Sequence, residues 1–320
     1  MKTRKLGLLA AAALALMAQA AGAETLKIAI PQKGNWDTSF VDYAIRQGFF
    51  KPEGLEVETI YTQGGAQTIQ AVVSGSVDAA MGTGMLGILG AFSKGAPVRV
   101  ISAEVTGAPD MFWYVKAESP FKSLKDMSNH TIAFSEAGSS SHLVLLSLLR
   151  QAGVTDARPT SVGGVPNSFT QVMSGQIDAG WSSVPLNLQG VADGKLRILA
   201  RGTDSKELHD ETIRANFTTA AVLAAKKDAL ARFGRVYKKA IDWAYSDPKA
   251  IEYLMADTKV SRPIAEQTIH EFIVKDSVQP DEIRGIDIAL KQAADFKFTP
   301  KLLTRQDVAP LFEAMPQQPK

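Results

Sequence analysis

The sequence predicts an α/β fold of two similar lobes, in which each lobe is a mostly parallel sheet flanked by helices and two strands form a hinge. Three observations predict it. Strand-like and amphipathic helical segments alternate, one block of sequence recurs about 100 residues downstream, and a strand-like segment lies on either side of the second copy. Because parallel strands need a crossover that is usually a helix, this alternation favours sheets covered on both faces.

The internal repeat is the most informative feature of the chain. Residues 61–84 resemble residues 161–184, and residues 28–48 resemble residues 132–153 in the same order. At an offset of 100 the first pair shares six residues, which are Gly64, Val72, Ser74, Gly75, Asp78 and Ala79 with their counterparts Gly164, Val172, Ser174, Gly175, Asp178 and Ala179. Apolar positions in both copies keep the i, i+3, i+4 spacing of one helix face. Two blocks in one order favour two similar lobes over a chance likeness of glycine-rich turns.

The order of elements in each copy follows from this pattern. The expected strands lie near residues 26–31, 55–61, 77–82 and 98–104 in the first copy and near 131–135, 159–162, 177–181 and 196–200 in the second. Strand-like segments at 111–116 and 216–223 are expected to cross between the lobes. Lobe 1 is therefore predicted to hold residues 24–112 and 218–320, and lobe 2 residues 113–217. Asp78 and Asp178, in matched turns, are expected to be structural.

The C-terminal part of the chain has a helical pattern. Residues 226–245 carry their apolar side chains on one face, and Asp247 with Pro248 supplies an N-cap and a first-turn proline for a helix over 249–256. Ser261 with Pro263 starts another helix, and residues 281–296 and 304–314 complete the set. We expect this tail to pack on lobe 1 and to carry no chemistry.

The N-terminus has the pattern of an export signal. Lys2, Arg4 and Lys5 precede a run without charge, residues 6–23, that ends in Ala21-Gly22-Ala23. A basic start, a short apolar run and a small-x-small site predict a signal peptide over residues 1–23, cleaved after Ala23. The apolar run is shorter than the roughly 20 residues that a membrane span needs, which disfavours a retained anchor.

Charge and composition exclude several classes of function. The precursor has 35 basic and 33 acidic residues, and removal of residues 1–23 leaves 32 basic against 33 acidic residues. The mature chain is then near neutral, so its net charge gives nucleic-acid binding no support. No cysteine is present, which excludes disulfides, thiolate metal sites and cysteine nucleophiles. The four histidines are scattered, and no enzyme motif or metal-ligand spacing occurs, so we expect no enzyme and no cofactor.

Candidate site residues follow from the loops after the strands. Open parallel sheets bind ligands beyond the carboxyl ends of their strands, where loops lead into helix N-termini with free N–H groups. If the two lobes face each other, these loops line one cleft between them. The expected ligand-binding residues are Gln32, Trp36, Gly64, Gly65, Thr83, Gly84, Ser139, Ser140, Ser141, His142, Trp181 and Ser182.

Each of these residues also has a purely structural interpretation. One serine of the Ser139–Ser141 run is enough to cap a helix, and Trp36 and Trp181 could belong to the core instead of a stacking wall. The glycines are explained by turns. Lys33 and His142 are the only clear cationic candidates in the loops, and Glu136 is acidic. An oxyanion would therefore be held mainly by N–H groups and hydroxyls, and a neutral or aromatic ligand is equally open.

Several short segments together resemble one family of proteins. LKIAIP, SGSVDAAMGTG, KGAPVRVI, GSSSH at a helix start and SGQIDA follow one another in an order that resembles the periplasmic substrate-binding proteins of the nitrate/sulfonate/taurine type of ABC importers. The likeness runs from about residue 24 to the end of the chain. It implies a periplasmic binding protein fold of the type II kind, whose two lobes close over a small molecule.

The same resemblance implies a function and partners. The protein would be a periplasmic monomer that binds a small organic anion, sulfonate- or taurine-like or nitrate-like, and delivers it to an inner-membrane permease with a cytoplasmic ATPase. An aromatic or pyrimidine solute, similar to a thiamine precursor, is the alternative ligand. A cytosolic pyrimidine synthase of the same fold is disfavoured by the absence of cysteine and by the export signal. A sensor that presents its ligand to a membrane receptor would have the same sequence features.

Overall fold

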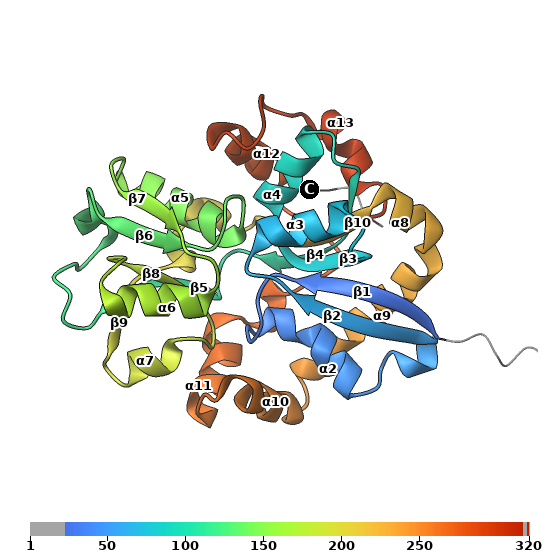
Figure 1. Ribbon diagram of the computed structural model, residues 1–320, viewed down its shortest axis with the longest axis horizontal. Helices are drawn as coiled ribbons and strands as arrows, with labels where there is room; N and C mark the ends of the chain where they lie inside the picture. Colours follow the sequence, from blue (N-terminus) through green and yellow to red (C-terminus); the bar gives the residue numbers. More distant parts are fainter. Residues whose placement is uncertain (1–22, 316–318, 320) are drawn as a thin grey trace, which may run out of the picture.

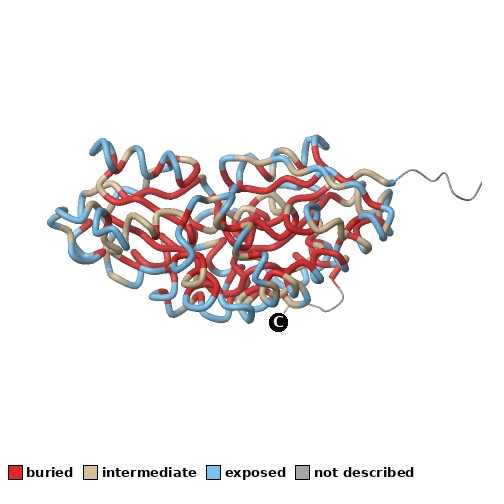
Figure 2. The backbone as a smooth tube through the Cα atoms, turned by 90° about the horizontal axis from the view of Figure 1, so that it is seen from below, coloured by how far each residue is buried: buried red, intermediate tan, exposed pale blue. Residues whose placement is uncertain are grey.

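The computed structural model describes residues 23–315 and residue 319. The predicted signal peptide therefore lies, apart from Ala23, outside the described residues. Figure 1 shows two groups of strands side by side, each covered by helices. Seen from below in Figure 2, the buried backbone runs through the middle of both groups, and the exposed segments lie on the outside. The predicted two-lobe α/β fold is confirmed.

The sheet of lobe 1 has five strands in the order β2-β1-β3-β10-β4. They are β1 (Glu24–Ile30), β2 (Leu55–Tyr61), β3 (Ala79–Gly84), β4 (Val98–Thr106) and β10 (Thr212–Thr219). β1 is parallel to both β2 and β3, whereas β10 runs antiparallel to both of its neighbours. The antiparallel strand is the one by which the chain returns from lobe 2.

The strands of lobe 2 repeat this order. They are β5 (Met111–Lys116), β6 (Thr131–Phe134), β7 (Arg158–Ser161), β8 (Gly180–Ser183) and β9 (Leu196–Arg201). β6 and β7 pair in parallel, β5 pairs antiparallel with β8 and β9, and a bridge between Ile132 and Ala179 joins the two groups. The spatial order β7-β6-β8-β5-β9 matches lobe 1 when β5 takes the place of β10.

The two copies of the repeat also share individual hydrogen bonds. The carboxylate of Asp78 accepts a hydrogen bond from the Lys27 amide at 2.8 Å, and that of Asp178 accepts one from the Thr131 amide at 2.8 Å. In each lobe an aspartate before one strand thus holds the backbone of the neighbouring strand, in the middle of β1 and at the start of β6. This matches the structural role expected for both residues.

The crossing between the lobes differs from the prediction. We expected residues 111–116 and 216–223 to cross, but β5 lies within the sheet of lobe 2 and β10 within that of lobe 1. The chain crosses instead in the connections 107–110 and 202–211. Residues 216–223 also do not form one strand, because β10 ends at Thr219 and a helix follows.

Helices cover both sheets (Figure 1). Those of the repeats are α2 (Phe40–Arg46), α3 (Gly65–Val73) and α4 (Met85–Ser93) in lobe 1, and α5 (Ser140–Ala152), α6 (Val165–Ser174) and α7 (Leu188–Ala192) in lobe 2. The tail forms α8 (Ala220–Ala225), α9 (Lys227–Ala244), α10 (Lys249–Thr258), α11 (Arg262–Gln267), α12 (Ile286–Asp295) and α13 (Arg305–Val308). Within the described residues, no helix has the length and apolarity that a membrane crossing requires.

The tail contacts both lobes, whereas we expected it to pack on lobe 1 alone. In lobe 1, α9 packs against α2 through a buried face that includes Phe233 and Tyr237. The turn after α11 reaches lobe 2, where the Phe272 ring lies 4.6 Å from the Arg201 guanidinium and 6.5 Å from the Phe112 ring. The tail also meets lobe 2 at the start of α5, where the Phe298 ring lies 5.6 Å from the His142 ring, so it contacts both lobes.

Candidate functional site

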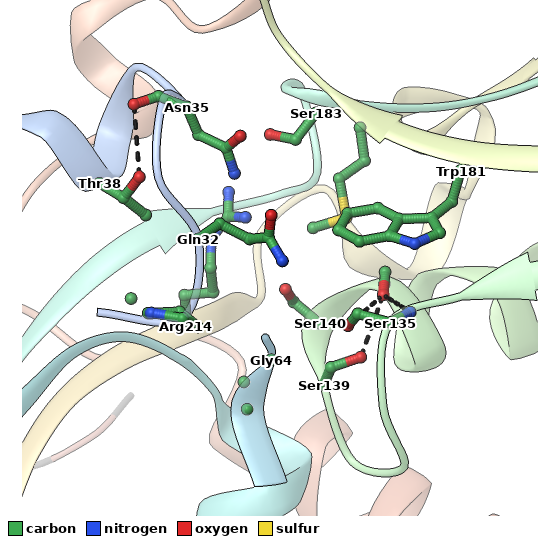
Figure 3. Close-up of a pocket in the computed structure, with 16 residues that line it drawn as sticks. Gln32, Asn35, Thr38, Gly64, Ser135, Ser139, Ser140, Trp181, Ser183 and Arg214 are labelled. Carbon is green, nitrogen blue, oxygen red and sulfur yellow. Dashed lines mark hydrogen bonds between the residues drawn. The ribbon is translucent and has the colours of Figure 1, made fainter. Parts of the chain in front are cut away.

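A narrow cavity lies between the lobes at the carboxyl ends of their central strands. Figure 3 shows its sixteen lining residues converging from the two lobes. Lobe 1 contributes Pro31, Gln32, Asn35, Thr38, Gly64, Gly65, Gly82, Gly84 and Arg214, and lobe 2 contributes Met111, Ser135, Ser139, Ser140, Ser141, Trp181 and Ser183.

Most of the residues predicted from sequence meet at this cavity. Gln32, Gly64, Gly65, Gly84, Ser139, Ser140, Ser141 and Trp181 line it. The other four, Trp36, Thr83, His142 and Ser182, do not. The loops after the strands thus reach the cavity, but the direction of individual side chains within them differs from the prediction.

Trp36 belongs to the core of lobe 1 instead of the cleft. Its side chain is fully buried, and its ring meets those of Phe40, Tyr43 and Tyr245 edge-on at 5.5–5.9 Å. The turn at Gly34, which has a φ of +90°, directs the chain into a short 3-10 helix, Asp37–Ser39. Trp36 precedes that helix and faces inward, so the predicted stacking role at this position is wrong.

His142 is a neutral aromatic residue in a buried stack. Its ring lies 4.0 Å from the Phe134 ring in a nearly parallel arrangement, and the Gly138 amide donates to its Nδ1 at 3.3 Å. Burial lowers the pKa of His142 to about 4. The residue is therefore uncharged at neutral pH and does not supply the positive charge that the sequence allowed.

Thr83 and Ser182 face away from the cavity. Thr83 is fully buried within β3, and the Ser182 hydroxyl donates to the Leu186 carbonyl at 2.8 Å. Ser183, the neighbour of Ser182, lines the cavity in its place. Successive side chains of a strand point to opposite faces of the sheet. An error of one residue in the prediction therefore selects a side chain on the wrong face.

The serines at the start of α5 form a hydrogen-bonded group. The Ser139 hydroxyl caps the helix by accepting from the His142 amide at 3.2 Å. The Ser141 hydroxyl accepts from the Ser135 amide at 2.9 Å and lies 3.0 Å from both the Ser135 and Ser139 hydroxyls. Ser140 lines the cavity outside this group. The first two serines of the run thus differ in role, since one caps and the next is available to a ligand.

Trp181 forms the aromatic wall of the cavity. It lies within β8 in the position matched to Met81, and its indole N–H donates to the Gly163 carbonyl at 3.2 Å. The ring is held in a fixed orientation, and Figure 3 shows the Gln32 side chain pointing toward it from lobe 1. A flat solute could lie against this ring and hydrogen-bond to the amide opposite.

Glycines allow the lobes to approach each other closely around the cavity. A Cβ on Gly84 would lie 2.6 Å from the Ser140 backbone nitrogen and 2.8 Å from the Gly138 carbonyl oxygen. The Gly87 amide also donates to the Gly138 carbonyl across the lobes at 2.9 Å. The N-terminal ends of α4 and α5 are therefore in direct backbone contact.

Arg214 is the charged residue that sequence reasoning missed. Among the described residues that line the cavity, it carries the one formal charge. It is 4% exposed, its Nη1 and Nη2 donate to both oxygens of Asp110 at 3.0 and 2.6 Å, and its Nε lies 3.4 Å from Asp37. The one signal for it was a single arginine within the otherwise uncharged strand TIRANFTT.

The charge of Arg214 is balanced within the protein. Burial raises the pKa of Asp37 and also that of nearby Glu104, while the arginine acts in the opposite direction on both. The Asp110 carboxylate also accepts from the Ser183 hydroxyl of lobe 2 at 2.6 Å. Lys33, the other cation expected from the sequence, lies over the Tyr61 ring, with Nζ 5.4 Å from its centroid. The described residues of the site therefore offer hydrogen-bond donors without an unpaired positive charge.

Metal binding has no support in the described part of the chain. No group of three or more histidine and acidic side chains is arranged to hold an ion there. The cavity itself is lined mainly by hydroxyls, amides, glycine backbone and one aromatic ring, together with Met111 and the paired guanidinium of Arg214. This arrangement suits a small organic or oxyanionic molecule held by hydrogen bonds.

Comparisons with known proteins agree with this description. The family model described as NMT1/THI5 like matches residues 35–251, more than half of the chain. A putative aliphatic sulfonates-binding protein of Escherichia coli (strain K12) is 32% identical over 142 residues. That alignment spans 44% of this chain and 44% of the relative, so the chain covers less than half of the relative's length.

Solved structures show the same fold at low identity. The periplasmic aliphatic sulphonate binding protein SsuA from Escherichia coli has a TM-score of 0.71 at 20% identity, with 93% of each chain covered. The alkanesulfonate-binding protein SsuA from Xanthomonas axonopodis pv. citri, bound to MOPS, has a TM-score of 0.73 at 19% identity, with 93% and 96% covered. The periplasmic nitrate-binding protein NrtA from Synechocystis PCC 6803 has a TM-score of 0.61 at 17% identity, with 75% and 68% covered.

Proposed function

The chain belongs to the NMT1/THI5-like family, and we propose that it is the extracytoplasmic solute-binding component of an ABC importer. In this role it takes a small solute into the cavity between its lobes and delivers it to a membrane permease. One observation carries the proposal. The cavity is built from both lobes at once, with Gln32 and the glycine loops on one side and Ser140 and Trp181 on the other.

A site shared by two lobes couples binding to closure. A solute that contacts both lobes stabilises the closed arrangement by its extra affinity for that arrangement over the open one. Rotation about the two connections, 107–110 and 202–211, would open the cleft as a hinge movement. A permease can then distinguish the loaded protein from the empty one by its closed surface.

The sequence left two classes of ligand open. The first is a small organic anion, sulfonate-, taurine- or nitrate-like, and the named relatives support this class. The second is an aromatic or pyrimidine-like solute, which the wall formed by Trp181 favours. A synthase of the same fold has no support in this chain, which has no cysteine and whose His142 stacks on Phe134 away from the cavity.

Native mass spectrometry tests the proposed function directly. We expect the freshly purified protein to retain a small molecule, or to show an increase in melting temperature with at least one member of a panel of sulfonates, nitrate, aromatic acids and pyrimidines. The protein should elute as a monomer from a sizing column. A preparation that holds no solute and responds to no member of the panel would contradict a role in solute binding.

Replacement of Ser140 by alanine is expected to weaken solute binding about 5- to 10-fold, because one neutral hydrogen bond contributes roughly 1 kcal/mol. The fold should be unaffected, since the Ser139 hydroxyl, and not that of Ser140, caps α5. Isothermal titration with the solute found above measures the change. Ser174→Ala, an exposed serine at the far end of α6, is the matched control. Equal affinities for the Ser140 variant and the control would place the binding site elsewhere.

A further inference from the structure

Glu136 reaches across the cleft and occupies the start of a helix in the other lobe. It lies in the loop after β6 of lobe 2, and its Oε2 accepts a hydrogen bond from the Gln67 amide in the first turn of α3 at 3.1 Å. A Cβ on Gly64 would lie only 2.7 Å from the same oxygen. Because Gly64 and Gly65 line the cavity, the carboxylate lies directly at its rim.

The start of α3 is a place where an anionic group would otherwise be favoured. Free N–H groups and the positive end of the helix dipole attract negative charge within the first turn. Here the protein's own carboxylate takes that position. An anionic solute bound at Gly64 and Gly65 would lie within a few ångströms of Glu136, and two like charges at that separation repel each other.

The second anion-attracting feature of the cavity is occupied in the same way. The Arg214 guanidinium is paired through two hydrogen bonds with Asp110 and lies near Asp37. Both the cation and the α3 helix start therefore already hold carboxylates of the chain itself. What remains for a solute is a set of neutral hydroxyls, amides and backbone groups, together with the Trp181 ring.

We propose that Glu136 is a charge-selectivity residue, and that the cavity takes solutes without net negative charge in preference to anions of the same shape. The inference rests on the proposed function, in that it presumes that a small solute binds between the lobes. It differs from the ligand class that the named relatives suggest. The difference comes from one side chain that the closed structure places against the opposite lobe.

A pair of probes with the same shape but different charge tests the inference. Ethanesulfonate is an anion at pH 7, and ethanesulfonamide is its neutral isostere. We expect the wild-type protein to bind the sulfonamide more tightly by isothermal titration. Glu136→Gln keeps an oxygen that can accept from the Gln67 amide but removes the charge. In this variant the affinity for sulfonate relative to sulfonamide should rise by about fivefold or more.

A second variant controls for the overall charge of the protein. Glu56 is exposed near the amino end of β2, so Glu56→Gln removes the same charge far from the cavity and should leave the relative affinity unchanged. A wild-type preference for sulfonate, or an equal change in the two variants, would overturn the inference.

Failure of the inference and failure of the proposed function give different results. If neither probe binds to either protein, the inference is overturned. The native mass spectrum then decides separately whether another solute is bound and the proposed function stands.

Discussion

Replacement of Asp110 by alanine is expected to lower the free energy of unfolding by about 3–5 kcal/mol, because it leaves the Arg214 charge buried without its hydrogen-bonded partner. The acidic groups that remain nearby are Asp37 and Glu104, and burial raises the pKa of both. Asp110 is fully buried and Arg214 is 4% exposed, so water cannot take the place of the lost carboxylate. Urea denaturation followed by tryptophan fluorescence measures the loss. The effect should also reach lobe 2, since Ser183 loses the acceptor for its hydroxyl.

The double variant Asp110→Ala with Arg214→Met is the control for this interpretation. It removes both charges and fills the arginine site with an apolar chain, so most of the lost stability should return. Asp37 would then lack its cation, but burial already favours its protonated form. A double variant that is no more stable than Asp110→Ala alone would show that packing around Asp110, and not its charge, accounts for the loss.

The features that the sequence predicted well are those determined by local pattern. The repeat and the alternation of elements gave the positions of eight strands to within about three residues, because the residues that form a strand and its turn are neighbours in the sequence. The strand expected at 216–223 begins four residues earlier, at Thr212. The start of α5 was found in the same way, since a glycine followed by serines is a helix-start pattern. Ser139, Ser140 and Ser141 all lie at the cavity as a result.

The features that were missed depend on contacts between distant parts of the chain. Trp36 and Trp181 were both expected just after a strand of their lobe, yet Trp36 is in the core and Trp181 lies within β8 and lines the cavity. The ring of Tyr245, about 200 residues further along, packs against Trp36 and helps to set its direction. Arg214 was likewise missed because its partners Asp37 and Asp110 lie more than 100 residues before it. No pattern of neighbouring residues indicates that this arginine pairs with these two aspartates.

Replacement of Gly84 by alanine is expected to weaken solute binding by at least about 100-fold, roughly 2.7 kcal/mol, while leaving each lobe folded. The backbone at Gly84 has a φ of −58° and a ψ of 127°, which alanine adopts without strain. Its Cβ, however, would meet the backbone of Gly138, Ser139 and Ser140 at 2.6–2.8 Å. These atoms belong to the backbone of the other lobe and cannot change rotamer as a side chain can. The substitution therefore destabilises the closed arrangement of the lobes and leaves the fold of each lobe intact.

This result separates closure from folding. The urea midpoint of Gly84→Ala should stay close to that of the wild type, and small-angle scattering should show a larger radius of gyration that solute no longer reduces. Gly234→Ala is the matched control, because a Cβ there meets no atom within 4 Å and alanine favours the surrounding helix α9. Solute affinity within about threefold of the wild type in Gly84→Ala would contradict a binding mechanism that requires these two helix ends to meet. Such a result would mean that solute binds to one lobe alone.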